Sequence, residues 1–131
     1  MDKVEQNLVD AATRARESAY APYSGYAVGA AALDADGRVF IGVNVENASY
    51  PVTICAERSA IAAMVGAGSR QLSKMAVATR DGALPCGLCL QTMLEFSPNP
   101  IDVFILAVDS SGSVVSRTLA GLLPFGFRLR P

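Results

Sequence analysis

Apolar residues follow two patterns along the chain, helical stripes and short continuous runs. A stripe of leucine, valine and alanine at helical spacing, with charged residues between, predicts a helix over about residues 3–20. Three later stretches, rich in alanine or leucine, predict helices over residues 54–68, 86–96 and 119–124. Five apolar runs typical of strands lie between the helices: AVGAAAL, RVFIGVNV, KMAVAT, IDVFILAV and VVSR. This alternation predicts an α/β domain layered around a central sheet.

The composition indicates one folded domain over residues 1–131 that acts on a small molecule. Hydrophobic residues make up 51% of the chain, which argues against disorder. Eleven basic residues balance twelve acidic ones without clustering, so we expect no nucleic-acid partner. No apolar run is long enough to span a membrane, and the first residues lack the apolar run of a signal peptide. We therefore expect a cytoplasmic protein without a membrane partner.

All three cysteines lie where predicted helices begin. Cys55 opens one helix in TICAERSAI, and Cys86 and Cys89 open the next in LPCGLC. Helix N-termini stabilise thiolates, and two residues three apart in a first turn can face the same point. Three cysteines cannot all form disulfides within one chain, so reduced thiols are the natural expectation.

Three interpretations of these thiols compete: a redox pair, small core residues, or a metal site. The CGLC motif alone leaves redox and metal binding about equally supported. Cys55 favours metal, because it has the same helix-start position and a redox pair needs no glutamate such as Glu57. The chain has no histidine, so a zinc ion held by the three thiolates would have a carboxylate or a water in its fourth position. Three protein ligands plus water is the arrangement of catalytic zinc, and Glu57 could address that water without being a ligand.

Zinc held by three thiolates carries a net negative charge, which makes a bound water less acidic. Compensation requires positive potential nearby, and two helix N-termini supply part of it. Arg58 directly follows Glu57 and would supply more by donating hydrogen bonds to the thiolate sulfurs. From its position alone, a solvated role on the helix surface explains Arg58 equally well.

The motif CAE followed by PCGLC resembles the three-cysteine variant of the zinc deaminase signature. Four blocks, YAPYSGYAVGAAAL, GVNVENASYPVTICAERSAI, PCGLCLQTMLEF and LLPFGF, are similar to successive segments of the small cytidine deaminases. They occur in the same order and cover nearly the whole chain. The resemblance implies a three-layer α/β/α sandwich with a central mixed five-stranded sheet. It also implies a homotetramer with shared active sites and one zinc per subunit.

The activity implied by the resemblance is hydrolytic deamination of cytidine and deoxycytidine to uridine and deoxyuridine, a step of pyrimidine salvage that releases ammonia. Cys55, Cys86 and Cys89 would be the zinc ligands, and Glu57 the proton shuttle. Glu57 would serve first as base and then as acid, which is ordinary general catalysis by one carboxyl group.

Six further residues match substrate-binding positions of the family: Tyr26, Asn44, Glu46, Ala56, Tyr50 and Phe127. The asparagine and Glu46 would bind ribose, and the backbone of the alanine would bind the base. Tyr26 stands where the family usually has a phenylalanine that packs on the pyrimidine. The other two aromatic residues would reach into the site of a neighbouring subunit. Without the resemblance, a turn in ENAS and simple core packing would be the preferred interpretations of these residues.

Two departures from the family pattern and the charge of Glu46 bear on the substrate. Leu90 directly follows Cys89, where members of the family commonly have an arginine after the C-x-x-C motif. Tyr26 adds a hydroxyl group that needs a hydrogen-bond partner if it is buried. A deaminase of another cytosine nucleoside, such as blasticidin S, is therefore the alternative within this fold. A non-catalytic zinc or redox module that uses CGLC is an alternative from another class. An ionised Glu46 would repel a phosphate, which favours free nucleosides over nucleotides.

Overall fold

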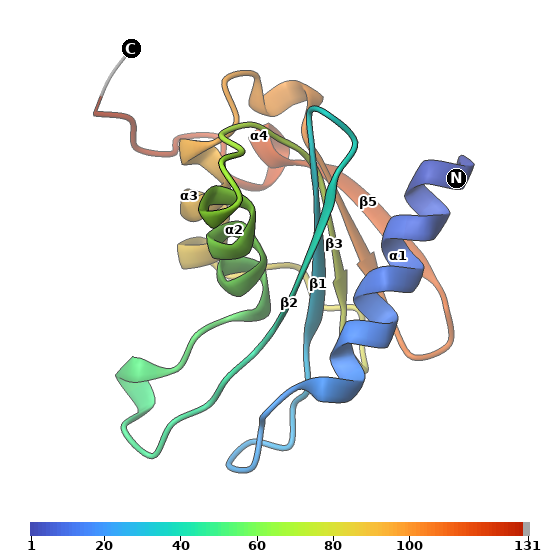
Figure 1. Ribbon diagram of the computed structural model, residues 1–131, viewed down its shortest axis with the longest axis vertical. Helices are drawn as coiled ribbons and strands as arrows, with labels where there is room; N and C mark the ends of the chain where they lie inside the picture. Colours follow the sequence, from blue (N-terminus) through green and yellow to red (C-terminus); the bar gives the residue numbers. More distant parts are fainter. Residues whose placement is uncertain (130–131) are drawn as a thin grey trace.

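A mixed five-stranded sheet forms the centre of the molecule (Figure 1). The computed structural model describes residues 1–129. The strand order is β2-β1-β3-β4-β5, with β3 and β4 parallel and the other neighbouring pairs antiparallel. The strands are β1 (Gly29–Asp34), β2 (Val39–Val43), β3 (Leu72–Ala78), β4 (Phe104–Val108) and β5 (Val114–Thr118).

Helices cover both faces of this sheet, which confirms the predicted three-layer α/β/α sandwich. Figure 1 shows α1 on one face and α2 with α3 on the other. The α-helices are α1 (Lys3–Ala15), α2 (Ala56–Gly66), α3 (Gly87–Glu95) and α4 (Leu119–Leu122). Three short 3₁₀ turns complete the elements: η1 (Arg16–Ser18), η2 (Tyr50–Val52) and η3 (Pro100–Asp102). No helix within residues 1–129 has the length and apolar character needed to cross a membrane.

The sheet has two buried faces, and β1 is buried along its whole length. Ala30 and Ala32 pack with α2 and α3, whereas Ala31 and Leu33 pack with α1. Alternate side chains of a strand point to opposite faces, so a strand covered on both sides needs small apolar residues throughout. The alanine-rich run AVGAAAL thereby lets both helical layers approach the sheet closely.

Gly42 in β2 sets the position of α2. A Cβ atom at this residue would lie 2.4 Å from the carbonyl oxygen of Ala56 and 2.4 Å from the backbone nitrogen of Ala60. Such an approach is possible only for glycine, which has no side chain. The first turn of α2, with Cys55 before it and Glu57 within it, is therefore seated directly against the sheet.

The first helix ends earlier than the sequence pattern predicts. It stops at Ala15, and a 3₁₀ turn continues to Ser18. Tyr20 then leaves the helical path, because its N–H donates to the carbonyl of Asn44 and its carbonyl accepts from the N–H of Glu46. Pro22 follows, and the residues just before a proline disfavour helix. This pairing fastens the segment after η1 to the segment that carries Asn44 and Glu46.

Candidate active site

The three cysteine sulfurs converge at one end of the sheet, where α2 and α3 begin. Cys55 is the N-cap residue of α2 and Cys86 that of α3, and Cys89 lies in the first turn of α3. Neither N-cap side chain makes a capping hydrogen bond to the backbone of its helix. The three sulfur atoms lie within 4.8 Å of one another, and those of Cys86 and Cys89 are 3.6 Å apart. All three are free thiols.

The sulfur cluster fits a tetrahedral zinc ion. Zinc–sulfur bonds of about 2.3 Å place two sulfurs of a tetrahedral site about 3.8 Å apart. The spacing of the three cysteines is of this size before any ion is added. Three protein donors leave one of four positions open, and no histidine exists in the chain to fill it.

The thiols of the cluster differ in how readily each gives up its proton. Hydrogen bonds with Cys89 and Cys86, together with the charge of Arg58, lower the pKa of Cys55 to about 6. The hydrogen bond to Cys55, burial and the negative charge of Glu57 raise the pKa of Cys89. One thiolate is thus favoured at the expense of the others. A divalent cation removes this conflict, because it displaces the thiol protons and offsets the negative charge.

Glu57, the predicted proton shuttle, lies beside the cluster. It lies in the first turn of α2 and is only 5% exposed. Burial raises the pKa of its carboxyl group, and negative charge on Cys55 raises it further. A carboxyl group in these surroundings holds a proton more readily than one in water, which suits a group that must both accept and donate.

A pocket of about 270 Å³ opens onto Glu57 and two of the cysteines. The structure brings three more of the predicted site residues, Tyr26, Asn44 and Ala56, to its wall. The lining comprises Tyr26, Val28, Asn44, Thr53, Cys55, Ala56, Glu57, Val77, Thr79, Ala83, Leu84, Pro85 and Cys86. The wall is mainly apolar with a few polar groups, as is usual for a small-molecule site.

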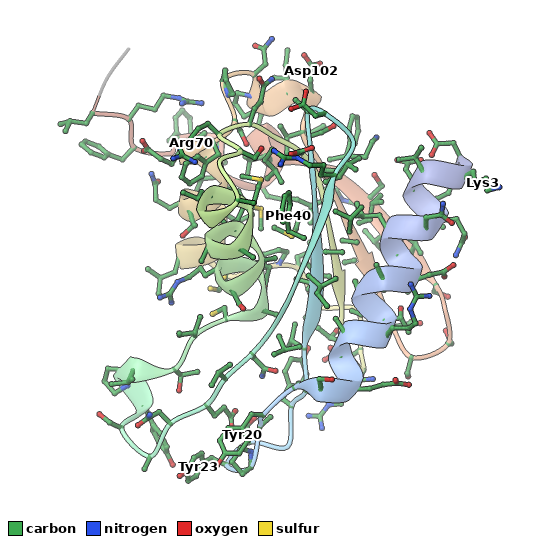
Figure 2. All side chains as sticks on the ribbon, viewed as in Figure 1. Lys3, Tyr20, Tyr23, Phe40, Arg70 and Asp102 are labelled. Carbon is green, nitrogen blue, oxygen red and sulfur yellow. The ribbon has the colours of Figure 1, made fainter. Side chains whose placement is uncertain are left out.

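A second pocket of about 350 Å³ adjoins the first and shares Thr53 with it. We call the first pocket, which contains Glu57 and two of the cysteines, the metal pocket, and the second the outer pocket. Glu46 and Tyr50 line the outer pocket together with Tyr23. Figure 2 shows Tyr23 near Tyr20 at the end of the molecule opposite to Arg70 and Asp102. The rings of Tyr23 and Tyr50 meet edge to face with centroids 6.1 Å apart. The two pockets together form a space larger than a single pyrimidine base needs.

Asn44 and Glu46 of the NVEN motif organise the segment between η1 and β1. The Asn44 side chain accepts from the N–H of Val28 at 2.9 Å and donates to the carbonyl of Tyr26 at 2.8 Å. Glu46 accepts from the N–H groups of Tyr23 and Ser24 and from the Ser24 hydroxyl group. These bonds, led by that of the Ser24 hydroxyl, hold the pKa of Glu46 below its usual range. Glu46 is therefore an anion at neutral pH.

Phe127 lies outside both pockets of its own chain. Its side chain is 68% exposed, and its backbone is held by Gln91 in α3. The Gln91 amide donates to the Phe127 carbonyl at 2.8 Å and accepts from the Phe127 N–H at 3.1 Å. Leu90, the neighbour of Gln91, is buried in the apolar layer that α2 and α3 share with the sheet. The departure from the family pattern predicted at Leu90 thus falls on a core position.

Sequence reasoning missed several residues of the site. Thr53 joins the two pockets, and Gln91 anchors the segment of Phe127. Arg80 and Asp81 contact Tyr26. Their spacing in the chain carries no signal, because these contacts arise from strand pairing and from the path of the last residues. Only the position of Gln91, two residues after Cys89 in the same helix, hinted at a role near the site.

Comparisons with known proteins agree with this arrangement. The family model described as the cytidine and deoxycytidylate deaminase zinc-binding region matches residues 2–105. A cytidine deaminase of Halalkalibacterium halodurans is 42% identical over 124 residues, covering 93% of this chain and 92% of that protein. One of Mycobacterium tuberculosis is 42% identical over 132 residues, covering 98% of this chain and 94% of that protein. A crystal structure of cytidine deaminase from Burkholderia pseudomallei superposes with a TM-score of 0.88 at 40% identity, covering 97% of this chain and all of the other.

Purified protein is expected to contain one zinc per chain, measurable by elemental mass spectrometry after dialysis. Cys86→Ser and Cys89→Ser should each lose most of this zinc, because a hydroxyl group is a poor replacement for a soft thiolate. Glu57→Gln is the matched control in the same pocket and should retain full zinc. Full zinc in both serine variants, or its loss in Glu57→Gln, would contradict the assignment of the three sulfurs as the ligands.

Proposed function

The chain belongs to the cytidine and deoxycytidylate deaminase family, and on this premise we propose that it converts cytidine and deoxycytidine to uridine and deoxyuridine with release of ammonia. The observation that carries the proposal is the buried carboxyl group of Glu57 beside three converging sulfurs, on the wall of a pocket. The protein is thus an enzyme of the zinc-dependent deaminase type, with residues 1–131 as one catalytic domain.

The proposed reaction divides between the metal and the residues of the chain. A bound zinc ion supplies Lewis acidity, which makes water a nucleophile at neutral pH. Cys55, Cys86 and Cys89 would hold the ion, and the N-termini of α2 and α3 with Arg58 would offset the charge of the thiolates. The conflict among the thiol protons supports this role for the sulfurs.

Glu57 would move the protons of the reaction. Hydrolysis at C4 of the cytosine ring requires that the attacking water lose a proton and that ring nitrogen N3 gain one. The amino group must then gain a proton before it leaves as ammonia. A single carboxyl group can perform these transfers in turn when its pKa lies closer to neutral, and burial raises the pKa of Glu57 in that direction.

The two adjoining pockets suit a nucleoside. The base would occupy the metal pocket, between Tyr26 and the backbone of Ala56. The sugar would extend past Thr53 and Asn44 toward Glu46 in the outer pocket. Glu46, an anion at neutral pH, can accept hydrogen bonds from ribose hydroxyl groups and would repel a phosphate on the same sugar.

The exposed aromatic residues support a homotetramer with shared active sites. Tyr50 is 71% exposed and Phe127 68% exposed, although both carry large apolar rings. Phe125 and Leu129 in the same last segment are exposed at 96% and 87%. Exposure of large apolar surfaces to water is unfavourable in free energy, and contact with another copy of the chain would bury them. We place the enzyme in the cytoplasm, where free thiols stay reduced.

Glu57→Gln should lower kcat for cytidine by about ten-thousandfold or more, because the variant loses the group that makes both proton transfers. Ammonia release and the ultraviolet change from cytidine to uridine measure the rate. Zinc content and thermal unfolding serve as controls and should match those of the original protein. A variant that keeps more than about a tenth of the original kcat would show that another group moves the protons.

Cytidine and deoxycytidine should both be deaminated, and cytidine monophosphate should have a kcat/KM lower by about 10- to 100-fold, the scale of repulsion between two nearby charges. Glu46→Gln should narrow this difference, because it removes one of the charges. Equal turnover of nucleoside and nucleotide would contradict the role of Glu46. A kcat/KM for blasticidin S above that for cytidine would identify the alternative substrate class.

The shared-site proposal predicts a tetramer in light scattering and a gain of activity on mixing two impaired variants. Phe127→Ala should lower activity at a neighbour's site, and Glu57→Gln should abolish it in its own. After subunit exchange, some sites combine an intact Glu57 with an intact Phe127, so the mixture should exceed the sum of its parts. An active monomer, or a mixture with no gain, would exclude shared sites.

A further inference from the structure

The ring of Tyr26 is held by two consecutive residues of the loop that follows β3. Its hydroxyl group donates to the Asp81 carboxylate at 2.5 Å. The guanidinium carbon of Arg80 lies over the ring, 5.0 Å from its centroid. The start of β1 pairs with the end of β3, so the segment before β1 and the loop after β3 meet at this edge of the sheet. Tyr26 and Asp81 are therefore neighbours although 55 residues separate them.

The Asp81 carboxylate is fixed independently of Tyr26. It accepts from the Thr79 hydroxyl at 3.2 Å and from the N–H of Ala83 at 3.4 Å. The Thr79 hydroxyl oxygen in turn accepts from the N–H groups of Gly82 and Ala83. The backbone of Asp81 forms a bridge with that of Asp109, which directly follows β4. The Asp81 carboxylate is thus held by contacts of its own loop, and the hydroxyl bond ties the Tyr26 ring to that loop.

This bond joins two segments that line the metal pocket. Tyr26 lines it, and the loop that contains Asp81 continues into Ala83, Leu84 and Pro85, which also line it. Arg80 covers the ring from outside the pocket lining, and the Tyr26 carbonyl accepts from Asn44. Both the backbone and the side chain of Tyr26 are therefore held before any substrate enters.

The titration behaviour of the pair agrees with a strong bond. Burial and the hydrogen bond with Asp81 raise the pKa of Tyr26. The hydrogen bond from Tyr26 is the main cause that lowers the pKa of Asp81. At neutral pH the pair is a neutral phenol donating to a carboxylate, the charge-assisted type of hydrogen bond.

We propose that Asp81 is a positioning residue, which orients the Tyr26 ring against the pyrimidine base and thereby sets the KM for cytosine nucleosides. The inference rests on the proposed function, since it takes the metal pocket to be the base site. Asp81 lines neither pocket and contacts neither Glu57 nor the sulfurs, among the contacts of residues 1–129. Its removal should therefore act on binding of the base and leave the chemical step nearly unchanged.

Tyr26→Phe and Asp81→Ala should each raise the KM for cytidine about fivefold, the scale of one partly exposed charge-assisted hydrogen bond, with kcat within about twofold. Asp81→Asn should recover part of the loss, because its amide oxygen can still accept from the hydroxyl group. In the Tyr26→Phe background, Asp81→Ala should raise KM no further, since both changes remove the same bond. Tyr20→Phe and Asp36→Asn are matched controls outside both pockets and should keep the original KM.

These measurements distinguish failure of the positioning role of Asp81 from failure of the proposed deaminase function. An unchanged KM in Tyr26→Phe, or additive effects in the double variant, would overturn the positioning role while leaving the proposed function intact. A fall in kcat with KM unchanged would also overturn it, because the bond would then serve the chemical step. Failure of the original protein, loaded with zinc, to deaminate any cytosine nucleoside would overturn the proposed function and this inference together.

Discussion

The crowding of three sulfur atoms within 4.8 Å is the constraint on which the rest of the structure depends. The pKa of Cys55 is lowered and that of Cys89 is raised, and a cation between the sulfurs would offset the repulsion among three thiolates. The sulfurs are crowded because the N-termini of α2 and α3, which carry the cysteines, lie close together. Gly42 permits one of them to lie directly on the sheet, and burial of Leu90 in the shared apolar layer holds the other beside it.

The crowded sulfurs are surrounded by positive potential and by one buried acid. Positive potential comes from the two helix N-termini and from Arg58, which lowers the pKa of Cys55. The one buried acid in contact with the cluster, among the described residues, is Glu57, and burial raises its pKa. Glu46, in the outer pocket, has the opposite surroundings, and hydrogen bonds lower its pKa. The pKa values of the two carboxyl groups thus shift in opposite directions because their environments differ, as the proposed roles of proton transfer for Glu57 and hydroxyl recognition for Glu46 require.

Much of this architecture could be predicted from the sequence, because periodicity and turn residues are local signals. The layers, the five strands and the start of both cysteine-bearing helices followed from such patterns. The end of α1 did not, since pairing of Tyr20 with Asn44 and Glu46 draws the chain out of the helix. The hydrogen bond between Tyr26 and Asp81 could not be predicted from the sequence either, because it depends on which strands are neighbours in the sheet. The division of the site into two pockets that share Thr53 could not be predicted either, because each pocket is lined by residues from separate parts of the chain.

The claim that zinc sits among three sulfurs with one open position is tested most directly by X-ray absorption at the zinc edge of the purified, zinc-loaded protein. The account predicts three sulfur neighbours at about 2.3 Å and one lighter neighbour at a shorter distance. Addition of substrate or product should change only the lighter contribution. Fewer than three sulfurs, or a light-atom shell that is indifferent to nucleoside, would contradict the account.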